Sequence, residues 1–382
     1  MKKILINLPI LGPAGINLVW LFKFKKFQSL GCQLFVFGGS FIHSLNLENE
    51  NLYFFNQRFT HLKASPTNKI KFILYSLVKN FWALFFIKKI IKNNYDIVYS
   101  PAASLDLILL PFIIKKLNKQ SKWLAIFDNI VPLKDPGNKI IRILAWLFFQ
   151  ISLIFLKKAD KIFVTTPESI QYLSKKTFGR DKIILAGYAV EGQLIKTAKA
   201  NSVHAFDALF VGRINETKGI YDMLKVLTLV KQKYPNFRLA IMGQGDETTE
   251  EQFKNKIKEM GLENNIQFLG YITGQKKFNI IKSAKVFWFL SVSQSESFGV
   301  ALLEAVCSGR LAIAYDLEQF KRIYQNDEVF IFPKGDYQSV AKKTIEIFDQ
   351  QKFGNERGQL LLEKYGNWDK IAEIEYNTII KM

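Results

Sequence analysis

The residues best suited to bind a charged ligand lie in the segment Ser291–Gly309, SVSQSESFGVALLEAVCSG. Gly299 opens a predicted helix, Glu296 lies in the loop before it, and Glu304 lies inside it. A glycine at a helix start lets a phosphate approach the backbone amides. Carboxylates accept strong hydrogen bonds from hydroxyl groups. The segment therefore favours a ligand with hydroxyls on both sides of a phosphate, as in a nucleoside-diphosphate sugar. Alternatively, both glutamates are solvated surface residues.

A second candidate segment is Ala208–Gly219, ALFVGRINETKG. A predicted strand ends at Gly212, and Arg213 and Lys218 flank the short loop before the next helix. Two cations at the carboxyl end of a strand suit a diphosphate and can offset the charge that builds up on a leaving nucleoside diphosphate. The alternative is that they are two ordinary surface cations.

Two weaker candidates lie in the first half of the chain. Gly12 and Gly15 bracket a turn after the first predicted strand, where a phosphate of donor or acceptor could approach, although plain turn chemistry explains them equally well. Asp128 follows the predicted strand Trp123–Phe127 and is positioned to contact a transferred sugar or an acceptor hydroxyl. The alternative, which explains Asp128 equally well, is a turn or helix-cap residue before Pro132.

The elements that must position these residues alternate regularly along the second half. The apolar runs predict strands, and helix-periodic segments separate them, as buried parallel strands require. The predicted strands are Ala208–Gly212, Arg238–Gly243, Ile266–Gly270, Val286–Ser291, Leu311–Tyr315 and Val329–Pro333, and the clearest helices are Ile220–Lys233, Glu250–Met260 and Tyr337–Gln350. The pattern predicts a doubly wound, Rossmann-like domain.

The first half follows the same rhythm. Its predicted strands are Lys3–Leu8, Gln33–Gly38, Asp96–Ser100, Trp123–Phe127, Lys161–Thr165 and Ile183–Ala186, with helices at Lys69–Lys92, Leu105–Leu117 and Lys139–Lys158. The polar stretch Thr197–His204 is the linker candidate. We therefore predict an α/β protein of two Rossmann-like doubly wound domains facing across a cleft, residues 1–200 and 201–365, with a terminal helix over 366–382 that crosses back to the first domain.

In the segments Ala208–Gly219 and Ser291–Gly309 the sequence resembles the retaining glycosyltransferases of family four, which have the GT-B fold. VGRINETKG resembles the family's Gly-Arg…Lys-Gly diphosphate element, ESFGVALLE resembles its Glu-x7-Glu element, and the ending from Trp368 resembles its terminal helix. The resemblance covers roughly residues 205–382 and is only architectural before them.

The resemblance implies a role for each matched residue. Arg213 and Lys218 would bind the donor diphosphate, Glu296 the transferred sugar, and Glu304 the ribose. The remaining donor-site residues would be Gly212, Tyr271 and Ile272 near the base, and Ser297, Phe298, Gly299 and Val300 around sugar and phosphate. Together with Asp128, the residues Arg213, Lys218 and Glu296 would be catalytic. No metal and no cofactor beyond the nucleotide-sugar substrate is expected.

The chain departs from the family pattern in its first half. Many members place a histidine before Asn or Asp at the Asp128 position, where this chain has Phe127, and the paired glycines of the first loop appear only as Gly12 and Gly15. Both departures concern the acceptor side, so they do not change the expected donor, a nucleoside-diphosphate hexose. The expected acceptor is a hydroxyl group of unspecified kind, lipid-linked or in an envelope polysaccharide.

Charge separates the two halves. Residues 1–200 carry 29 Lys and Arg against 10 Asp and Glu, a net +19, whereas residues 201–382 carry 24 against 23. A basic half suits an anionic membrane or nucleic acid; the alternative is a general preference for lysine on solvated faces. Within Lys69–Lys92 an apolar stripe, Ile70, Ile73, Leu74, Leu77, Phe81, Leu84 and Phe85, runs at helical spacing beside lysines. It indicates either a helix lying on a membrane or a core-facing helix with a solvated lysine face.

Location follows from the termini, cysteines and apolar runs. Cys32 and Cys307 are too few for a disulfide framework, which favours a reducing compartment, and the three histidines fit no zinc spacing. The basic, apolar start suits a first strand better than a signal peptide, because Asn7 and Pro9 interrupt it. The longest apolar run, Ile143–Leu156, is predicted too short to span a membrane. We expect a cytoplasmic protein, peripheral on the inner face of the membrane.

Other functions share parts of this pattern. A nucleotide-sugar epimerase or a phosphorylase can use the same two-domain architecture, the first releasing sugar without an acceptor and the second requiring phosphate or pyridoxal. A nucleic-acid-binding protein would use the basic half, but no interleaved basic and aromatic motif is visible, which makes nucleic acid an unlikely partner. An inactive, nucleotide-binding relative is the remaining alternative.

Overall fold

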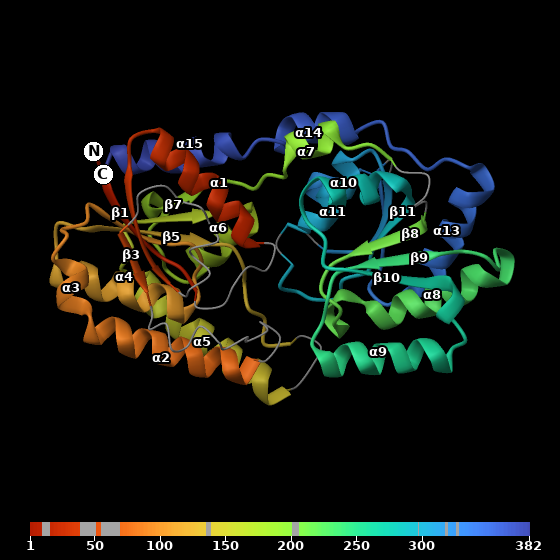
Figure 1. Ribbon diagram of the computed structural model, residues 1–382, viewed down its shortest axis with the longest axis horizontal. Coiled ribbons are helices and arrows are strands. Elements are labelled where there is room, and N and C mark those ends of the chain that lie inside the picture. The colour runs from red at the N-terminus through yellow and green to blue at the C-terminus, as the bar shows by residue number, and fades with distance from the viewer. Residues whose placement is uncertain are drawn as a thin grey trace. The chain divides into compact units, whose positions relative to one another are not determined.

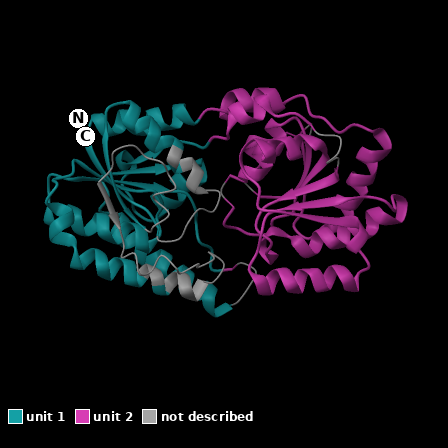
Figure 2. Ribbon diagram, in the orientation of Figure 1, with its two compact units in different colours: residues 1–133, 139–188, 368–382 teal, residues 134–138, 189–367 magenta. Residues whose placement is uncertain are grey.

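The computed structural model describes residues 1–9, 16–38, 51–54, 69–134, 139–200, 206–296, 298–317, 320–325 and 328–382. The chain divides into two compact units (Figure 2). The N-terminal unit comprises residues 1–133, 139–188 and 368–382, and the C-terminal unit comprises residues 134–138 and 189–367. The change of unit near residue 188 lies upstream of the predicted linker, and the C-terminal helix belongs to the N-terminal unit.

The N-terminal unit is built on a parallel sheet with strand order β3-β2-β1-β4-β5-β6-β7. The strands are β1 Lys3–Asn7, β2 Gln33–Gly38, β3 Asn51–Phe54, β4 Ile97–Ser100, β5 Lys122–Phe127, β6 Lys161–Val164 and β7 Ile183–Leu185. The strand order reverses at β1, as in a doubly wound fold. All predicted strands of this half are confirmed. The sequence analysis missed β3, whose apolar run is only four residues long and follows Glu48 and Glu50.

Helices cover both faces of this sheet (Figure 1). α1 (Ile16–Ser29) and α15 (Trp368–Ile380) pack together on one side, and α4 (Leu105–Leu117) packs against both α2 (Lys69–Phe85) and α5 (Lys139–Leu156) on the other. The remaining helices are α3 Ile87–Ile91 and α6 Pro167–Lys175, with the 3-10 turn η3 Arg180–Lys182. The predicted single helix Lys69–Lys92 is therefore two helices, interrupted at Phe86.

A buried ion pair holds α15 in the N-terminal unit. Lys23 of α1 donates to Glu375 of α15 at 2.6 Å, and the Tyr99 hydroxyl of β4 donates to the same carboxylate at 2.6 Å. Glu375 is fully buried and Lys23 nearly so. Burial and the adjacent carboxylate raise the pKa of Tyr99, so its hydroxyl stays protonated as a donor. Because an isolated buried carboxylate would be costly, the three groups fix the C-terminal helix to this unit.

The apolar stripe of α2 was interpreted either as the face of a helix lying on a membrane or as a core-facing stripe. The exposure of its side chains decides between these two interpretations. Leu77, Phe81 and Phe85 are 54%, 70% and 74% exposed, whereas Lys79 on the opposite side is fully buried and donates to the Asp106 carbonyl. The interpretation of a core-facing apolar stripe with a solvated lysine face is therefore wrong for the described side chains. Burial lowers the pKa of Lys79 to about 8.

Helix α5 corrects the prediction that no apolar run is long enough to cross a membrane. It has 18 residues with a mean hydropathy of 1.9, and it is the one helix of the described residues that is long and apolar enough to do so. Only 22% of it is buried. The predicted apolar run Ile143–Leu156 is the greater part of this helix, which begins at Lys139, as the predicted helix Lys139–Lys158 does, and so includes Arg142.

The C-terminal unit has a second parallel sheet, with strand order β10-β9-β8-β11-β12-β13. Its strands are β8 Phe206–Val211, β9 Leu239–Met242, β10 Ile266–Gly270, β11 Ala284–Phe289, β12 Leu311–Tyr315 and β13 Val329–Phe332, all as predicted within a few residues. Its helices are α7 Gly192–Thr197, α8 Ile220–Lys233, α9 Glu247–Glu259, α10 Gly274–Ser283, α11 Val300–Cys307, α12 Phe320–Ile323, α13 Tyr337–Gln350 and α14 Gly358–Tyr365, with the 3-10 turns η5 Glu216–Lys218 and η6 Glu263–Asn265.

The core of this unit packs large rings between sheet and helices. Trp288 of β11 is fully buried and stacks on Phe237 at 5.7 Å, and α8 contributes Leu224 and Leu227 to the same core. Such dense packing keeps the strand ends rigid, and the loops at those ends carry the predicted site residues.

Candidate active site

The two predicted donor-binding segments meet because β8 and β11 are neighbours. The turn η5 follows β8, and the loop after β11 runs beside it. The Val292 amide donates to the Thr217 carbonyl at 3.0 Å, and the Ser291 hydroxyl lies 3.0 Å from the same oxygen. Backbone contacts therefore fix residues separated by more than 70 positions in the sequence at the carboxyl edge of the sheet.

An ion pair joins the two segments at this edge. Lys218 Nζ contacts Glu296 Oε1, and the two side chains are only 19% and 13% exposed. The Ser291 hydroxyl lies 3.1 Å from the same carboxylate oxygen, and the ring of Phe289 lies 5.9 Å from the ammonium. The fold thus brings Lys218 and Glu296 together, as the sequence analysis predicted. Their opposite charges neutralise each other at a site that is partly shielded from solvent.

The start of α11 has the geometry expected of a phosphate-binding turn. Gly299 has φ 63°, and a Cβ atom there would lie 2.8 Å from the Phe320 ring. The side chain of Phe298 is buried against Tyr365, with ring centroids 5.5 Å apart. The Phe298 ring is therefore not available to a ligand, and any contact with one falls to the backbone amides of Phe298, Gly299 and Val300.

A second ion pair surrounds Glu304. Lys277 of α10 donates to Glu304 Oε1 at 2.5 Å, and the Glu304 side chain is only 6% exposed. Glu191, before α7, belongs to the same cluster: burial raises its pKa, Lys277 lowers it and Glu304 raises it. The sequence analysis missed Lys277 and Glu191, because a lysine beside Lys276 looks like a solvated residue and Glu191 lies about 110 residues before Glu304.

The remaining predicted residues of the C-terminal unit occupy the ends of other strands. Arg213 is exposed directly after β8 and Gly212. Tyr271 is 50% exposed and Ile272 is half-buried, both directly after β10. The carboxyl ends of β8, β10 and β11 lie along one edge of the sheet, so these residues line the same edge as Lys218 and Glu296.

Three predicted residues cannot be placed, and the metal prediction stays open. Gly12, Gly15 and Ser297 lie outside the described residues. Across the described parts of the chain, no three His, Cys, Asp or Glu side chains gather as a metal would require. Metal independence remains a prediction.

Asp128 lies at the carboxyl end of β5 in the N-terminal unit, where it was predicted. It is half-buried, and Asn129 Nδ2 donates to its carboxylate at 3.4 Å. Burial raises the pKa of Asp128 to about 6, although backbone hydrogen bonds and the charge of Lys23 act in the opposite direction. A carboxyl group with a pKa near 6 can exchange protons close to neutral pH, which suits a residue that meets a hydroxyl.

We expect Asp128→Asn to stabilise the protein at pH 7.5. The raised pKa means that ionisation costs more in the folded than in the unfolded chain, where the pKa is about 3.9. The cost is complete above pH 6 and disappears below about pH 4, so the variant gains about 1–3 kcal/mol at pH 7.5 and nothing at pH 4. Thermal unfolding at both pH values measures it. Exposed Asp181→Asn is the control, and a less stable Asp128→Asn protein at pH 7.5 would refute the assignment.

The two parallel, doubly wound units and the strand-end site define the GT-B class of glycosyltransferase folds. Residues 194–361 match the family described as glycosyl transferases group 1. The matched part of the chain holds the ion pairs of Glu296 and Glu304, and its likeness to that family supports the predicted glycosyltransferase family, whereas the predicted two-domain fold is confirmed.

Mannosyltransferases are among the proteins that this chain resembles. The chain is 32% identical over 159 residues to a phosphatidyl-myo-inositol mannosyltransferase of Mycobacterium leprae, which covers 41% of this chain and 39% of the relative. It is 29% identical over 115 residues to a GDP-mannose:cellobiosyl-diphosphopolyprenol alpha-mannosyltransferase of Xanthomonas campestris, 30% of each protein. The chain thus spans about two fifths or less of the length of these relatives.

Solved structures extend the likeness to the whole fold. The Anabaena protein Alr3699/HepE, solved in complex with UDP and glucose, superposes with a TM-score of 0.76 at 15% identity, over 100% of both chains. At this identity the likeness shows the fold alone. It includes the N-terminal unit, where the sequence resemblance was only architectural.

Proposed function

We propose that this protein transfers a hexose from a nucleoside-diphosphate sugar to a hydroxyl acceptor. The observation that carries the proposal is the Lys218–Glu296 pair beside the amides at the start of α11. It joins a cation for phosphate, a carboxylate for sugar hydroxyls and a helix start at one strand edge. The match of residues 194–361 to the glycosyl transferases group 1 and the likeness of the chain to mannosyltransferases support the same reaction class.

In this proposal the donor lies along the strand ends of the C-terminal unit. Arg213 and Lys218 bind its diphosphate, and the amides of Phe298, Gly299 and Val300 complete the phosphate contacts. Glu296 accepts hydrogen bonds from the transferred sugar. Glu304, which is paired with Lys277, accepts them from the ribose, and the backbone at Tyr271 and Ile272 meets the base.

The chemical step retains the anomeric configuration and needs no metal. The bond from the anomeric carbon to the β-phosphate oxygen breaks, and the acceptor oxygen bonds to the same face of the sugar. The proton of the acceptor hydroxyl passes to the leaving phosphate, whose charge Arg213 and Lys218 stabilise. Asp128 of the N-terminal unit contacts the acceptor.

The acceptor is proposed to be a lipid-linked or envelope-polysaccharide hydroxyl. The names of the two mannosyltransferases above contain a phosphatidyl-inositol and a diphosphopolyprenol, which are both lipids. Cys32 and Cys307 are buried free thiols, which accords with a cytoplasmic protein at the inner membrane face.

A thermal-shift panel of UDP, GDP, ADP and their sugars tests the donor site. At 100 times its dissociation constant the preferred nucleotide stabilises the native state by about 2.7 kcal/mol, a rise readily seen in the melting temperature. We expect one base to be preferred and Glu304→Gln to weaken the shift, whereas Glu346→Gln, at a half-exposed glutamate of α13, leaves it unchanged. A protein that responds to none of the nucleotides would overturn the proposal, and free sugar released without acceptor would indicate an epimerase.

A further inference from the structure

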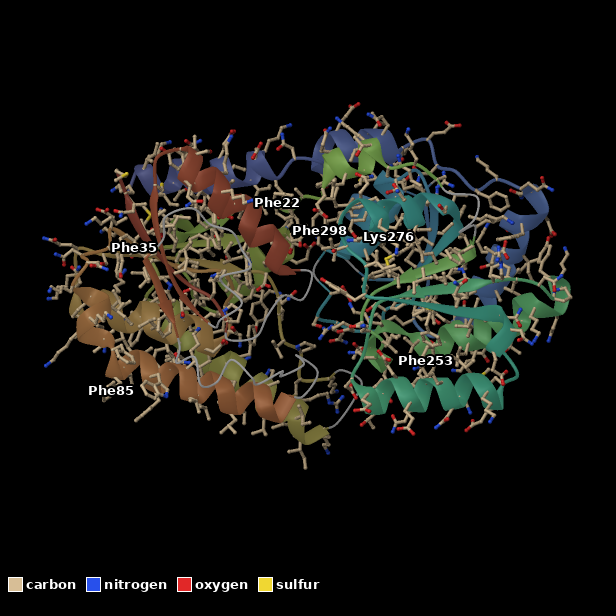
Figure 3. The ribbon with its side chains drawn as sticks, viewed as in Figure 1. Phe22, Phe35, Phe85, Phe253, Lys276 and Phe298 are labelled. Carbon is tan, nitrogen blue, oxygen red and sulfur yellow. The ribbon has the colours of Figure 1, made fainter. Side chains whose placement is uncertain are left out.

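Two helices of the N-terminal unit turn apolar stripes to solvent. On α2 these are Leu77, Phe81 and Phe85, and Figure 3 labels Phe85 on the side of the helix away from the sheet. On α5, Ile140 is 70%, Leu147 44% and Ile154 66% exposed. These positions recur every four residues on α2 and every seven on α5, which places them along one outward face of each helix.

The inner sides of both helices are already packed. Lys79 and Ala83 of α2 face inward and are buried, and Phe149 and Leu153 of α5 pack in the core of the unit. The outward stripes are therefore additional apolar surface, not core residues left partly uncovered. A soluble monomer rarely exposes apolar residues in such ordered rows, and larger patches mark interaction sites.

The two stripes lie on the same side of the sheet. α4 packs against both helices, and Figure 1 shows α2 and α5 on one side of the strands. We call the outer surface of α2 and α5 the α2–α5 face. Two apolar rows on the same layer form a broad surface, which suits an extended apolar phase better than a short peptide groove.

The charges around the α2–α5 face have one sign. Residues 69–92 and 139–158 contain six and four Lys or Arg and no Asp or Glu. Lys88 and Lys89 are exposed directly after the apolar row of α2, and Lys139, Lys157 and Lys158 are exposed at the two ends of α5. Apolar rows with cations at their ends complement a bilayer with anionic headgroups, because the chains sink in while the ammonium groups reach phosphate.

We propose that the α2–α5 face docks this protein onto an anionic lipid bilayer, with both helices lying in the plane of the membrane surface. α5 does not span the bilayer, because it connects β5 and β6, which are hydrogen-bonded neighbours in one sheet. The inference deepens the proposed function, since it places the enzyme where a lipid-linked acceptor is found. Only the biological purpose of docking rests on the proposed function, because docking itself requires neither donor binding nor catalysis.

Vesicle flotation of the full chain tests the docking. The wild type is incubated at low salt with two kinds of vesicle. One is phosphatidylcholine alone, and the other contains about 30% phosphatidylglycerol, which gives the surface the negative charge of an anionic leaflet. We expect flotation with the anionic vesicles and at least tenfold weaker partition for Phe81→Asp/Phe85→Asp and for Ile140→Asp/Ile154→Asp. Leu360→Asp, at an apolar residue 60% exposed on α14 of the other unit, is the matched control and should float as the wild type does.

Because all substituted side chains are exposed, the variants should keep the wild-type melting temperature and nucleotide shift. These two readouts separate loss of docking from loss of folding or of donor binding. Equal flotation of wild type and both double variants would overturn the proposal. So would a wild-type dimer that fails to float and that the same substitutions convert to monomers, because the occupant would then be a second copy of the chain.

Discussion

Lys218→Ala will lower the rate of glycosyl transfer by about 10²–10³-fold, the loss typical of removing one donor to a developing negative charge. The effect should fall on kcat as well as on donor binding, because Lys218 lies where the leaving diphosphate gains charge. The variant also leaves the partly desolvated carboxylate of Glu296 without its ammonium partner. This repels a diphosphate and reinforces the loss. Release of nucleoside diphosphate from the preferred donor measures the rate.

Lys225→Ala provides the matched control. Lys225 lies on α8, seven residues further along, and its ion pair with Asp222 is half exposed. Such a pair contributes little, so this variant should keep wild-type activity. Lys218→Arg should recover part of the rate, since it keeps the charge but cannot reproduce the contact with Glu296. A Lys218→Ala enzyme within threefold of the wild-type rate would remove Lys218 from the mechanism.

Gly219→Ala will lower the melting temperature by about 10 °C, corresponding to a loss of about 3–5 kcal/mol. Gly219 has φ 73°, and a Cβ atom there would lie 1.9 Å from the Leu290 carbonyl oxygen. That oxygen belongs to the backbone, so no side-chain rotation relieves the clash. The loop after β11 must move, and it carries Ser291 and Glu296. We therefore expect the nucleotide shift to weaken together with stability.

Gly261→Ala separates the two components of this effect. Gly261 has φ 62°, but nothing lies within 4 Å of the Cβ position. This substitution pays only for the left-handed backbone, about 1 kcal/mol, and should lower the melting temperature by about 2–4 °C. If both glycine variants lost the same stability, the close approach of Gly219 to Leu290 would carry no cost and the expected rigidity of this edge would be wrong.

Sequence reasoning recovered most of the fold because buried parallel strands are short and continuously apolar. Runs such as Ala208–Gly212 and Leu311–Tyr315 lie between helix-periodic segments, and this alternation leaves few topologies. β3, at the edge of its sheet, escaped because its apolar run of four residues is short and follows the polar stretch that contains Glu48 and Glu50. The break of α2 at Phe86 escaped because the apolar period continues across it.

The sequence by itself determined which residue types stand in the candidate site: local motifs fix Arg213, Lys218 and Glu296 in loops after strands and Glu304 in the helix that follows. Only the tertiary structure decided their partners. The adjacency of β8 and β11 places Lys218 on Glu296, and α10 brings Lys277 to Glu304, although neither pair has a sequence signature. The same holds for α2, whose period predicts an apolar stripe but not which side meets the sheet. That choice depends on packing against α4 and on the burial of Lys79, which are contacts between segments distant in the chain.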